Sequence, residues 1–189
     1  SGGALPMIEE GVLENPHVEA VIGLHVDENI PSGMIGLKKG VVNAASNPFT
    51  ITIKGKGGHG ARPEDAIDPV VIASSVVMNL QSIVSRELTP TEPSVLTIGT
   101  IHGGTAQNII PEEVTISGII RTMTKEHREY VKNRLVEITE GITKSLRGSC
   151  DIEITESYPC LYNDDKMLEL LRKSAVEQIG TENIKILDK

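Results

Sequence analysis

The chain of 189 residues carries 18 lysines and arginines against 26 aspartates and glutamates, which gives a formal net charge of −8. Because affinity for a phosphate backbone comes mainly from basic side chains, this balance disfavours nucleic-acid binding. One phenylalanine, three tyrosines and no tryptophan also leave no aromatic platform for base stacking. No apolar run in the sequence approaches the roughly 20 residues that a membrane span needs. We therefore expect a cytoplasmic protein with neither a nucleic-acid partner nor a membrane partner.

Hydrophobic periodicity predicts a central unit between about residues 47 and 156. Residues 49–53 alternate apolar side chains with threonine, which is the period of a half-buried strand. Asp68 followed by Pro69 is a typical helix start, and Thr124 can cap a second helix that ends at Gly148. The predicted elements, in order, are strand 49–53, helix 69–87, strand 94–101, strand 114–120, helix 125–147 and strand 152–154.

This order of elements is that of a split βαβ unit. The fold class that we expect is therefore α+β, with a ferredoxin-like four-stranded antiparallel sheet and two helices on one of its faces. With so few aromatic residues in the chain, the core between sheet and helices must be aliphatic.

The flanks of the central unit predict pieces of a second domain. Before it, we expect a helix near Leu5, a strand over 20–25, a loop over 29–33 and a further short strand. After it, Asp164 or Asp165 can cap a helix that Gly180 stops. Two incomplete pieces around one complete unit indicate a small domain inserted in a larger one. The chain also begins without an initiator methionine, and we expect it to be the inside of a longer chain.

Histidine is the residue type in this sequence that most often acts in catalysis or metal binding, and the five histidines differ in their sequence context. His17 and His127 lie among polar and charged neighbours, and His102 lies at a strand end, so ordinary solvated roles are expected for them. His25 ends an apolar run at 21–24, where a strand would deliver it to the edge of a sheet. That position suits either a satisfied strand-end histidine or a metal ligand.

The most unusual context is that of His59, which lies in the segment Gly-Lys-Gly-Gly-His-Gly at 55–60. The missing side chains allow a close approach to one imidazole. A plain hairpin turn and a phosphate-binding loop are the alternatives, although the glycine spacing fits neither the Walker nor the dinucleotide pattern.

Two further polar residues stand out among apolar or turn-forming neighbours. Asn108 lies in the turn-rich segment 103–111, where its carboxamide can either satisfy loop backbone groups or contact a ligand. Arg121 ends the apolar run 114–120 and can either clamp a carboxylate with two hydrogen bonds or simply cap the sheet.

Taken together, these segments resemble the aminoacylase and carboxypeptidase metallohydrolases, in the branch of hippurate hydrolase, N-acetyldiaminopimelate deacetylase and the auxin-conjugate amidohydrolases. Each segment alone is weak evidence for the family, but six segments in the family's order are a specific match. The segments are Gly-Gly-Ala at 2–4, Gly-Leu-His-Val at 23–26, Gly-Lys-Gly-Gly-His-Gly-Ala at 55–61, Asp-Pro at 68–69, Gly-Gly-Thr-Ala-Gln-Asn-Ile-Ile-Pro at 103–111 and Gly-Ile-Ile-Arg-Thr at 118–122.

The resemblance implies a dimeric enzyme that uses two divalent metal ions, Zn or Mn, to hydrolyse N-acyl amino acids or short peptides. Residues 1–43 would belong to the catalytic domain, 44–157 would form an inserted lid that also makes the homodimer, and 158–189 would return to the catalytic domain.

Four residues match functional positions of that family. By position, His25 matches a metal ligand, and His59 matches a lid histidine that steadies the oxyanion in the partner subunit's active site. Asn108 matches an asparagine that contacts the substrate at the same place, and Arg121 matches the arginine that holds the substrate carboxylate.

The chain also departs from the family's pattern. The upstream metal-ligand motif, the Glu-Glu pair just before Gly-Gly-Ala and the last histidine are absent, and Glu9-Glu10 follows that segment inside a predicted helix. We therefore expect the excised chain to be inactive and to hold no metal stably. The alternative function is a non-catalytic small-ligand-binding or assembly module of ferredoxin-like fold, because fold does not fix function.

Overall fold

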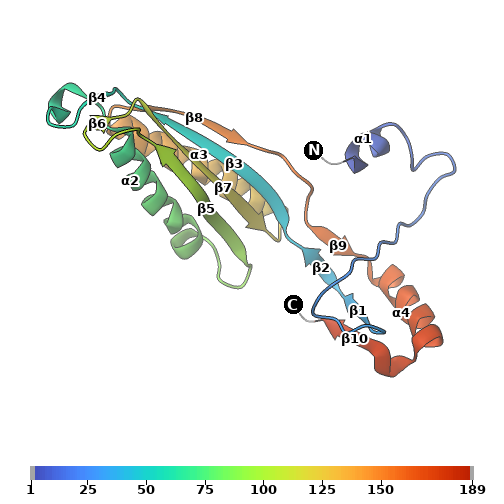
Figure 1. The fold of residues 1–189 in the computed structure, drawn as a ribbon. Coiled ribbons are helices and arrows are strands. Elements are labelled where there is room, and N and C mark those ends of the chain that lie inside the picture. The colour runs from blue at the N-terminus through green and yellow to red at the C-terminus, as the bar shows by residue number, and fades with distance from the viewer. Residues whose placement is uncertain (1–2, 188–189) are drawn as a thin grey trace. The chain divides into compact units, whose positions relative to one another are not determined.

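The computed structural model describes residues 3–187, which form two compact units (Figure 1). Unit 1 contains the chain up to Val42 and again from Tyr162 onward. Unit 2 is the continuous segment Asn43–Leu161. Unit 2 therefore interrupts unit 1 in sequence, and it ends four residues later than the boundary at 157 that the sequence suggested.

Unit 2 is built on one four-stranded sheet whose neighbouring strands are all antiparallel, with the order β5-β7-β3-β8. Two helices, α2 and α3, contact each other and pack against this sheet. The elements are β3 (Ala45–Lys54), α2 (Pro69–Ser82), β5 (Ser94–Gly103), β7 (Glu113–Thr122), α3 (Lys125–Ser145) and β8 (Ser149–Ile154).

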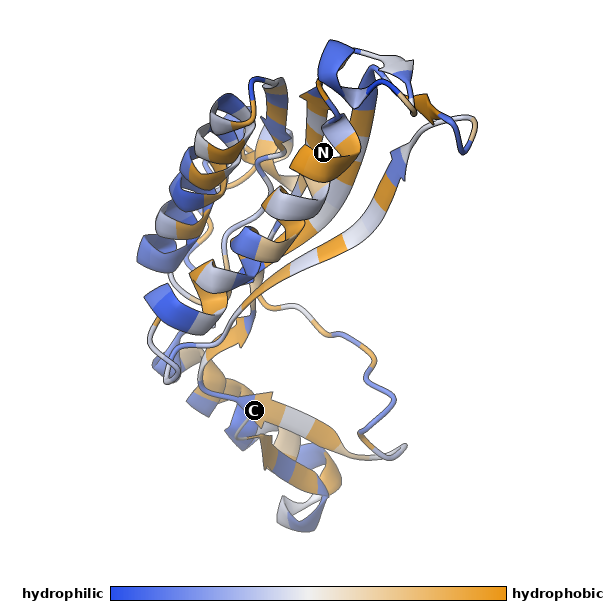
Figure 2. Cartoon of the chain, turned by 90° about the vertical axis from the view of Figure 1, so that its left-hand side faces the viewer, coloured by the Kyte–Doolittle hydropathy of each residue, from blue (hydrophilic) through white to orange (hydrophobic). Residues whose placement is uncertain are grey.

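Alternation of side chains explains the sheet and its core. In β3, Phe49, Ile51 and Ile53 are buried, while the threonines between them are only half-buried. The strands accordingly show alternating orange and paler or blue bands (Figure 2). One face of the sheet thus closes a core with α2 and α3, which contains Phe49, Ile51, Ile53, Ile72, Ala73, Val76, Leu80, Ile83, Leu96, Val114, Ile116, Ile120, Val131 and Leu135.

Both helices of unit 2 begin at the predicted caps. The Asp68 carboxylate accepts a hydrogen bond from the amide of Val70 at 2.8 Å, and Pro69 occupies the first helical position. The Thr124 hydroxyl accepts from the amide of His127 at 3.2 Å. The α-helical geometry of α2 ends at Ser82, and a π-helical turn, η2 (Ile83–Glu87), continues it to the predicted end.

The expectation that His127 is an ordinary solvated side chain is wrong. Its side chain is only 16% exposed, and its Nε2 lies 3.2 Å from Oε2 of Glu92. Its Nδ1 lies 3.3 Å from Oγ of Ser94. The polar neighbours in sequence suggested exposure, but the first turn of α3 directs this ring towards the beginning of β5, which no local pattern reveals.

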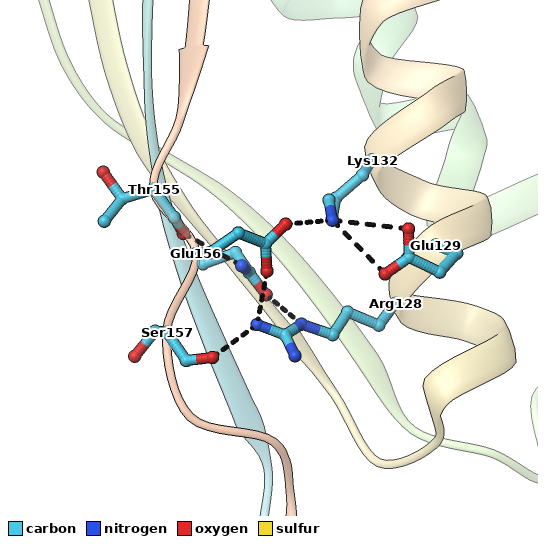
Figure 3. A network of polar contacts seen from close by, with 7 residues as sticks. Arg128, Glu129, Lys132, Thr155, Glu156 and Ser157 are labelled. Carbon is cyan, nitrogen blue, oxygen red and sulfur yellow. Dashed lines mark hydrogen bonds and ion pairs between the residues drawn. The ribbon is translucent and has the colours of Figure 1, made fainter. Parts of the chain in front are cut away.

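A buried polar network ties the end of the sheet to α3 (Figure 3). Asn47 is fully buried in β3; its Nδ2 donates to the carbonyl of Thr155 at 2.9 Å, and its Oδ1 accepts from Nε of Arg128 at 2.8 Å. Arg128 also donates to Glu156 at 2.9 Å and to the carbonyl of Ser157 at 2.6 Å. The chain that leaves β8 is therefore anchored to both β3 and α3.

Unit 1 consists of short elements. A parallel pair joins β1 (Ile35–Lys38) to β10 (Ile184–Leu187), and β2 (Gly40–Asn43) pairs with β9 (Leu161–Asn163). Asp164 caps α4 by accepting from the amide of Lys166 at 2.9 Å, and Gly180, with φ of 81°, ends it. The other elements are α1 (Ala4–Glu9), α4 (Asp165–Ile179) and η3 (Thr181–Asn183).

The strand predicted over 20–25 is not formed. These residues have no regular secondary structure; Leu24 among them is 90% exposed, and Val26, which follows the segment, is 91% exposed. A strand needs a neighbour for its backbone hydrogen bonds, and residues 3–187 give this segment none. No helix within that range is long and apolar enough to cross a membrane.

Candidate functional site

Two of the predicted site residues, His59 and Asn108, belong to one short ribbon at a tip of unit 2. The strand β4 (Gly58–His59) pairs antiparallel with β6 (Ile109–Ile110), so that His59 lies opposite Ile109. The amide of Gly60 donates to the carbonyl of Asn108 at 2.7 Å. His59, in β4, and Asn108, directly before β6, are 49 positions apart in the sequence but thus belong to one short ribbon.

The polar groups of these two residues face solvent. Both residues are exposed. The Nδ1 atom of His59 accepts from the amide of Ala61 at 3.1 Å. Among the described residues, neither Nε2 of His59 nor the carboxamide of Asn108 has a hydrogen-bond partner, so both are available to a ligand.

The glycines around His59 serve the packing of this ribbon against the chain's own backbone. A Cβ atom on Gly60 would lie 3.0 Å from the carbonyl oxygen of Asn108. A Cβ atom on Gly55 would lie 2.2 Å from the carbonyl oxygen of Ile67. The close approach that the sequence indicated is therefore, at these positions, an approach of one backbone segment to another, which at Gly60 is the segment of Asn108.

Arg121 lies in the four-stranded sheet, near the end of β7 that is far from the β4/β6 ribbon. It is exposed near the end of β7 and lies opposite Ser46 of β3 and Val95 of β5. The tip ribbon precedes β7, which begins at Glu113. Arg121 lies eight positions after Glu113 in this strand, which is about 26 Å at the rise of an extended chain. Arg121 and His59 of one chain therefore do not meet at one small ligand.

His25 belongs to unit 1 and is exposed. Its Nδ1 lies 2.6 Å from the carbonyl oxygen of Val26, which accepts a hydrogen bond from it and leaves Nε2 free. Two residues on, hydrogen bonds from the amide and side chain of Asn29 hold the pKa of Asp27 below its ordinary value. An imidazole whose Nδ1 donates to a carbonyl is well oriented for a metal at Nε2.

His25 does not make a metal centre on its own. Residues 3–187 contain no group of three or more histidine, cysteine, aspartate or glutamate side chains that can hold a metal ion. A dinuclear centre needs several such ligands around each ion. The donor set that the structure describes therefore does not fit a complete two-metal site.

A second feature of unit 2 is an uncharged surface made by α2 and β5, which we call the α2/β5 surface. No charged residue occurs from Pro69 to Ser85 or from Ser94 to Gly103. The α2 helix packs over β5, and β5 is an edge strand that pairs only with β7 among the strands described. The exposed apolar side chains of this surface are Val70, Val71 and Met78 of α2 and Ile101 of β5, whereas Val95 points to the other face of the sheet because its neighbour Leu96 is in the core.

The opposite side of unit 2 is charged. The edge strand β8 carries Asp151 and Glu153, and Asp151 pairs with Lys54 at 2.5 Å. The α3 helix, which packs over β8, carries charged residues along its whole length. Charges protect an edge strand from pairing with another chain, whereas an uncharged edge permits it. The uncharged run at 69–85 is visible in the sequence, but its position beside a free edge is not.

Comparison with known proteins places the chain in a family. Residues 43–146 match the model of a peptidase dimerisation domain, which covers more than half of the chain and most of unit 2. The chain belongs to the M20 peptidases, a family of hydrolases, and unit 2 carries the dimerisation domain of that family.

Curated relatives carry the names of deacetylases. The chain is 39% identical over 173 residues to the N-acetyl-L-cysteine deacetylase of Bacillus subtilis, a match that covers 92% of the chain and 41% of the relative. It is 39% identical over 168 residues to the N-acetyldiaminopimelate deacetylase of Bacillus velezensis, which covers 89% of the chain and 45% of that relative. The chain therefore spans less than half the length of these relatives.

Solved structures agree with this placement. A putative aminohydrolase from methicillin-resistant Staphylococcus aureus matches with a TM-score of 0.86 at 35% identity, over 94% of this chain and 47% of that one. A dinuclear metal-binding M20 peptidase of Bacillus subtilis matches with a TM-score of 0.73 at 27% identity, over 98% and 45%.

Proposed function

We propose that this chain is part of a metal-dependent amidohydrolase that cleaves N-acyl amino acids or short peptides, with unit 2 as its lid and dimerisation domain and unit 1 as part of its catalytic domain. The observation that carries the proposal is the β4/β6 ribbon at one exposed tip, where His59 lies opposite Ile109 and Gly60 binds the backbone of Asn108. Membership of the M20 family and the deacetylase names of two relatives support the reaction class.

The tip suits the stabilisation of an oxyanion. When water attacks an amide carbonyl, the oxygen gains negative charge, and a hydrogen-bond donor directed at that oxygen lowers the barrier by about 3 to 4 kcal/mol. The ring of His59 and the carboxamide of Asn108 are two donors of this kind, and both are free of other partners among the described residues. The backbone bond between Gly60 and Asn108 holds the two segments that carry these donors against each other.

The separation of about 26 Å along β7 supports a dimer in which each active site uses two chains. Arg121 can hold the carboxylate of an N-acyl amino acid through two parallel hydrogen bonds. No such substrate reaches from Arg121 to His59 of the same chain. In our proposal, His59 and Asn108 therefore serve the active site of the partner subunit. Arg121 serves a different active site from the one that His59 of the same chain serves.

The α2/β5 surface is the surface that we assign to the homodimer. A twofold axis beside β5 lets the two β5 edges pair antiparallel, so that two four-stranded sheets continue into one. The exposed valines and Met78 of α2 then cover each other across the same axis. No charge has to be desolvated in this arrangement, because neither element carries one.

The metal chemistry is assigned to a longer polypeptide of which this chain is a part. His25 supplies one ligand through Nε2, and the remaining ligands and the general base lie outside the 189 residues. Divalent ions bound there polarise the amide carbonyl and lower the pKa of bound water. The chain by itself accordingly has no amidohydrolase activity in this proposal.

Amine release from a panel of N-acetyl and N-benzoyl amino acids tests the proposal. The assay uses a longer polypeptide that contains this chain, loaded with Zn²⁺ or Mn²⁺. His59→Ala should lower kcat by roughly 10²- to 10³-fold. The matched control is His17→Ala, since His17 is exposed in unit 1 and has no assigned role. Unchanged turnover in His59→Ala contradicts the proposal, as does tight binding of a free amino acid without any hydrolysis.

A further inference from the structure

The hydrogen bond between Ala61 and His59 determines where the imidazole carries its proton. A backbone amide only donates, so Nδ1 of His59, 3.1 Å from the amide nitrogen of Ala61, must accept and is unprotonated. A neutral imidazole has one N–H group, and with Nδ1 as acceptor that group is at Nε2. The ring therefore presents a donor, not an acceptor, on its free side.

The backbone around His59 is fixed on both sides, which keeps this geometry in place. On one side, β4 pairs with β6, and Gly60 binds Asn108 at 2.7 Å. On the other side, the amide of Arg62 donates to the carbonyl of His59 at 2.8 Å and closes a tight turn over Ala61. The amide of Ala61 is thus held beside the ring by hydrogen bonds that do not involve the ring itself.

We infer that the backbone amide of Ala61 is a positioning group that holds His59 as the Nε2–H tautomer, so that His59 acts on a substrate oxygen as a neutral hydrogen-bond donor and not as a proton acceptor. The donor role rests on the proposed function, whereas the tautomer is a property of the chain alone. Gly60 supports the tautomer of His59 indirectly, since a Cβ atom at position 60 would lie 3.0 Å from the carbonyl oxygen of Asn108 and disturb the ribbon.

Nitrogen-15 NMR of the 189-residue chain labelled at histidine tests the tautomer without any assay of activity. Above the pH at which histidines titrate, Nδ1 of His59 should resonate as a fully unprotonated ring nitrogen and Nε2 as a fully protonated one. The exposed His17 provides the reference for a ring that averages between tautomers. Loss of one pair of signals in His59→Gln assigns the resonances. Averaged shifts for His59, or a proton on Nδ1, overturn the inference.

Two variants at position 61 separate the amide from the side chain. Ala61→Gly keeps the N–H group and should leave the His59 shifts unchanged. Ala61→Pro removes the N–H group and should move them towards the averaged values of His17. If Ala61→Pro folds and leaves the tautomer fixed, the amide is not the group that sets it. If it does not fold, the wild-type spectrum still decides between a fixed and an averaged ring.

Activity of the longer polypeptide tests the donor role separately. A glutamine amide can place an N–H group near the position of Nε2, whereas alanine supplies no donor. His59→Gln should therefore keep at least about tenfold more kcat/KM than His59→Ala, which corresponds to one retained hydrogen bond. Equal losses in the two variants overturn the donor role. If no His59 variant changes turnover while the NMR spectrum shows a fixed tautomer, the proposed function fails and the tautomer assignment stands.

Discussion

Replacing Asn47 by alanine should destabilise unit 2 through the loss of a buried polar centre. Asn47 is fully buried and makes two hydrogen bonds, to Nε of Arg128 at 2.8 Å and to the carbonyl of Thr155 at 2.9 Å. A hydrogen bond to a charged group contributes about 1.5 to 3 kcal/mol, and a neutral one about 0.5 to 1.5 kcal/mol. Because Thr155 is exposed, water can replace the second bond in part. The expected loss is about 3 kcal/mol.

Urea denaturation of the 189-residue chain measures this loss. The control is Thr50→Ala in the same strand, because Thr50 lies on the other face of the sheet and makes none of the hydrogen bonds of the network. That control should change the free energy of unfolding by less than about 1 kcal/mol. Equal effects of the two substitutions would refute the reasoning, because they would show that the Asn47 network adds nothing beyond strand propensity.

Three further substitutions test other parts of the account. The hydroxyl of Thr139 is buried without a partner among the described residues, so Thr139→Val should raise the free energy of unfolding by about 1 kcal/mol; a loss in urea denaturation would contradict this. Arg134 donates to Glu87 at 2.7 Å and lowers the pKa of that carboxyl below its ordinary 4.5. The stabilisation by this ion pair is therefore present above pH 4.5 and is lost as the pH falls through the pKa of Glu87 in the folded protein. Glu87→Gln should therefore flatten the acid limb of the stability profile, and an unchanged acid limb would refute the assignment. Met78→Glu should weaken dimerisation in sedimentation experiments by at least about tenfold, whereas Asn133→Glu on the charged α3 helix should not; equal effects would exclude the α2/β5 surface.

Features that depend on local pattern were predictable from the sequence. The alternation from Phe49 to Ile53 predicts the buried face of β3, because side chains on a strand alternate between its two faces. Asp68, Thr124 and one of Asp164 and Asp165 predict the starts of three helices, because a cap acts within three residues of its position, and the third cap is Asp164.

Features that depend on distant partners were not predictable. The apolar run at 21–24 has the composition of a strand, but strand formation needs a neighbour that the described residues do not supply. The reverse holds for β10 (Ile184–Leu187), which forms because β1 is available to pair with it. His127 gave no local signal of burial, since its contacts with Glu92 and Ser94 come from another part of the fold.

The candidate site shows the same division. The residue types at positions 59, 108 and 121 were identifiable from the motifs of a family, but their arrangement was not. Only the pairing of β4 with β6 joins the segments of His59 and Asn108, and only the course of β7 separates them from Arg121. Because of that separation, our proposal requires two chains to form each active site.

Mixed dimers of the longer polypeptide test the central claim most directly, namely that His59 acts in the active site of a second chain. One chain carries His59→Ala and the other carries His25→Ala, and each variant alone should be inactive. If His59 acts across the dimer, a one-to-one mixture regains one complete site per mixed dimer, or about a quarter of wild-type amine release by the statistics of random pairing. If His59 acts within its own chain, no mixed dimer contains a complete site, and the mixture stays inactive.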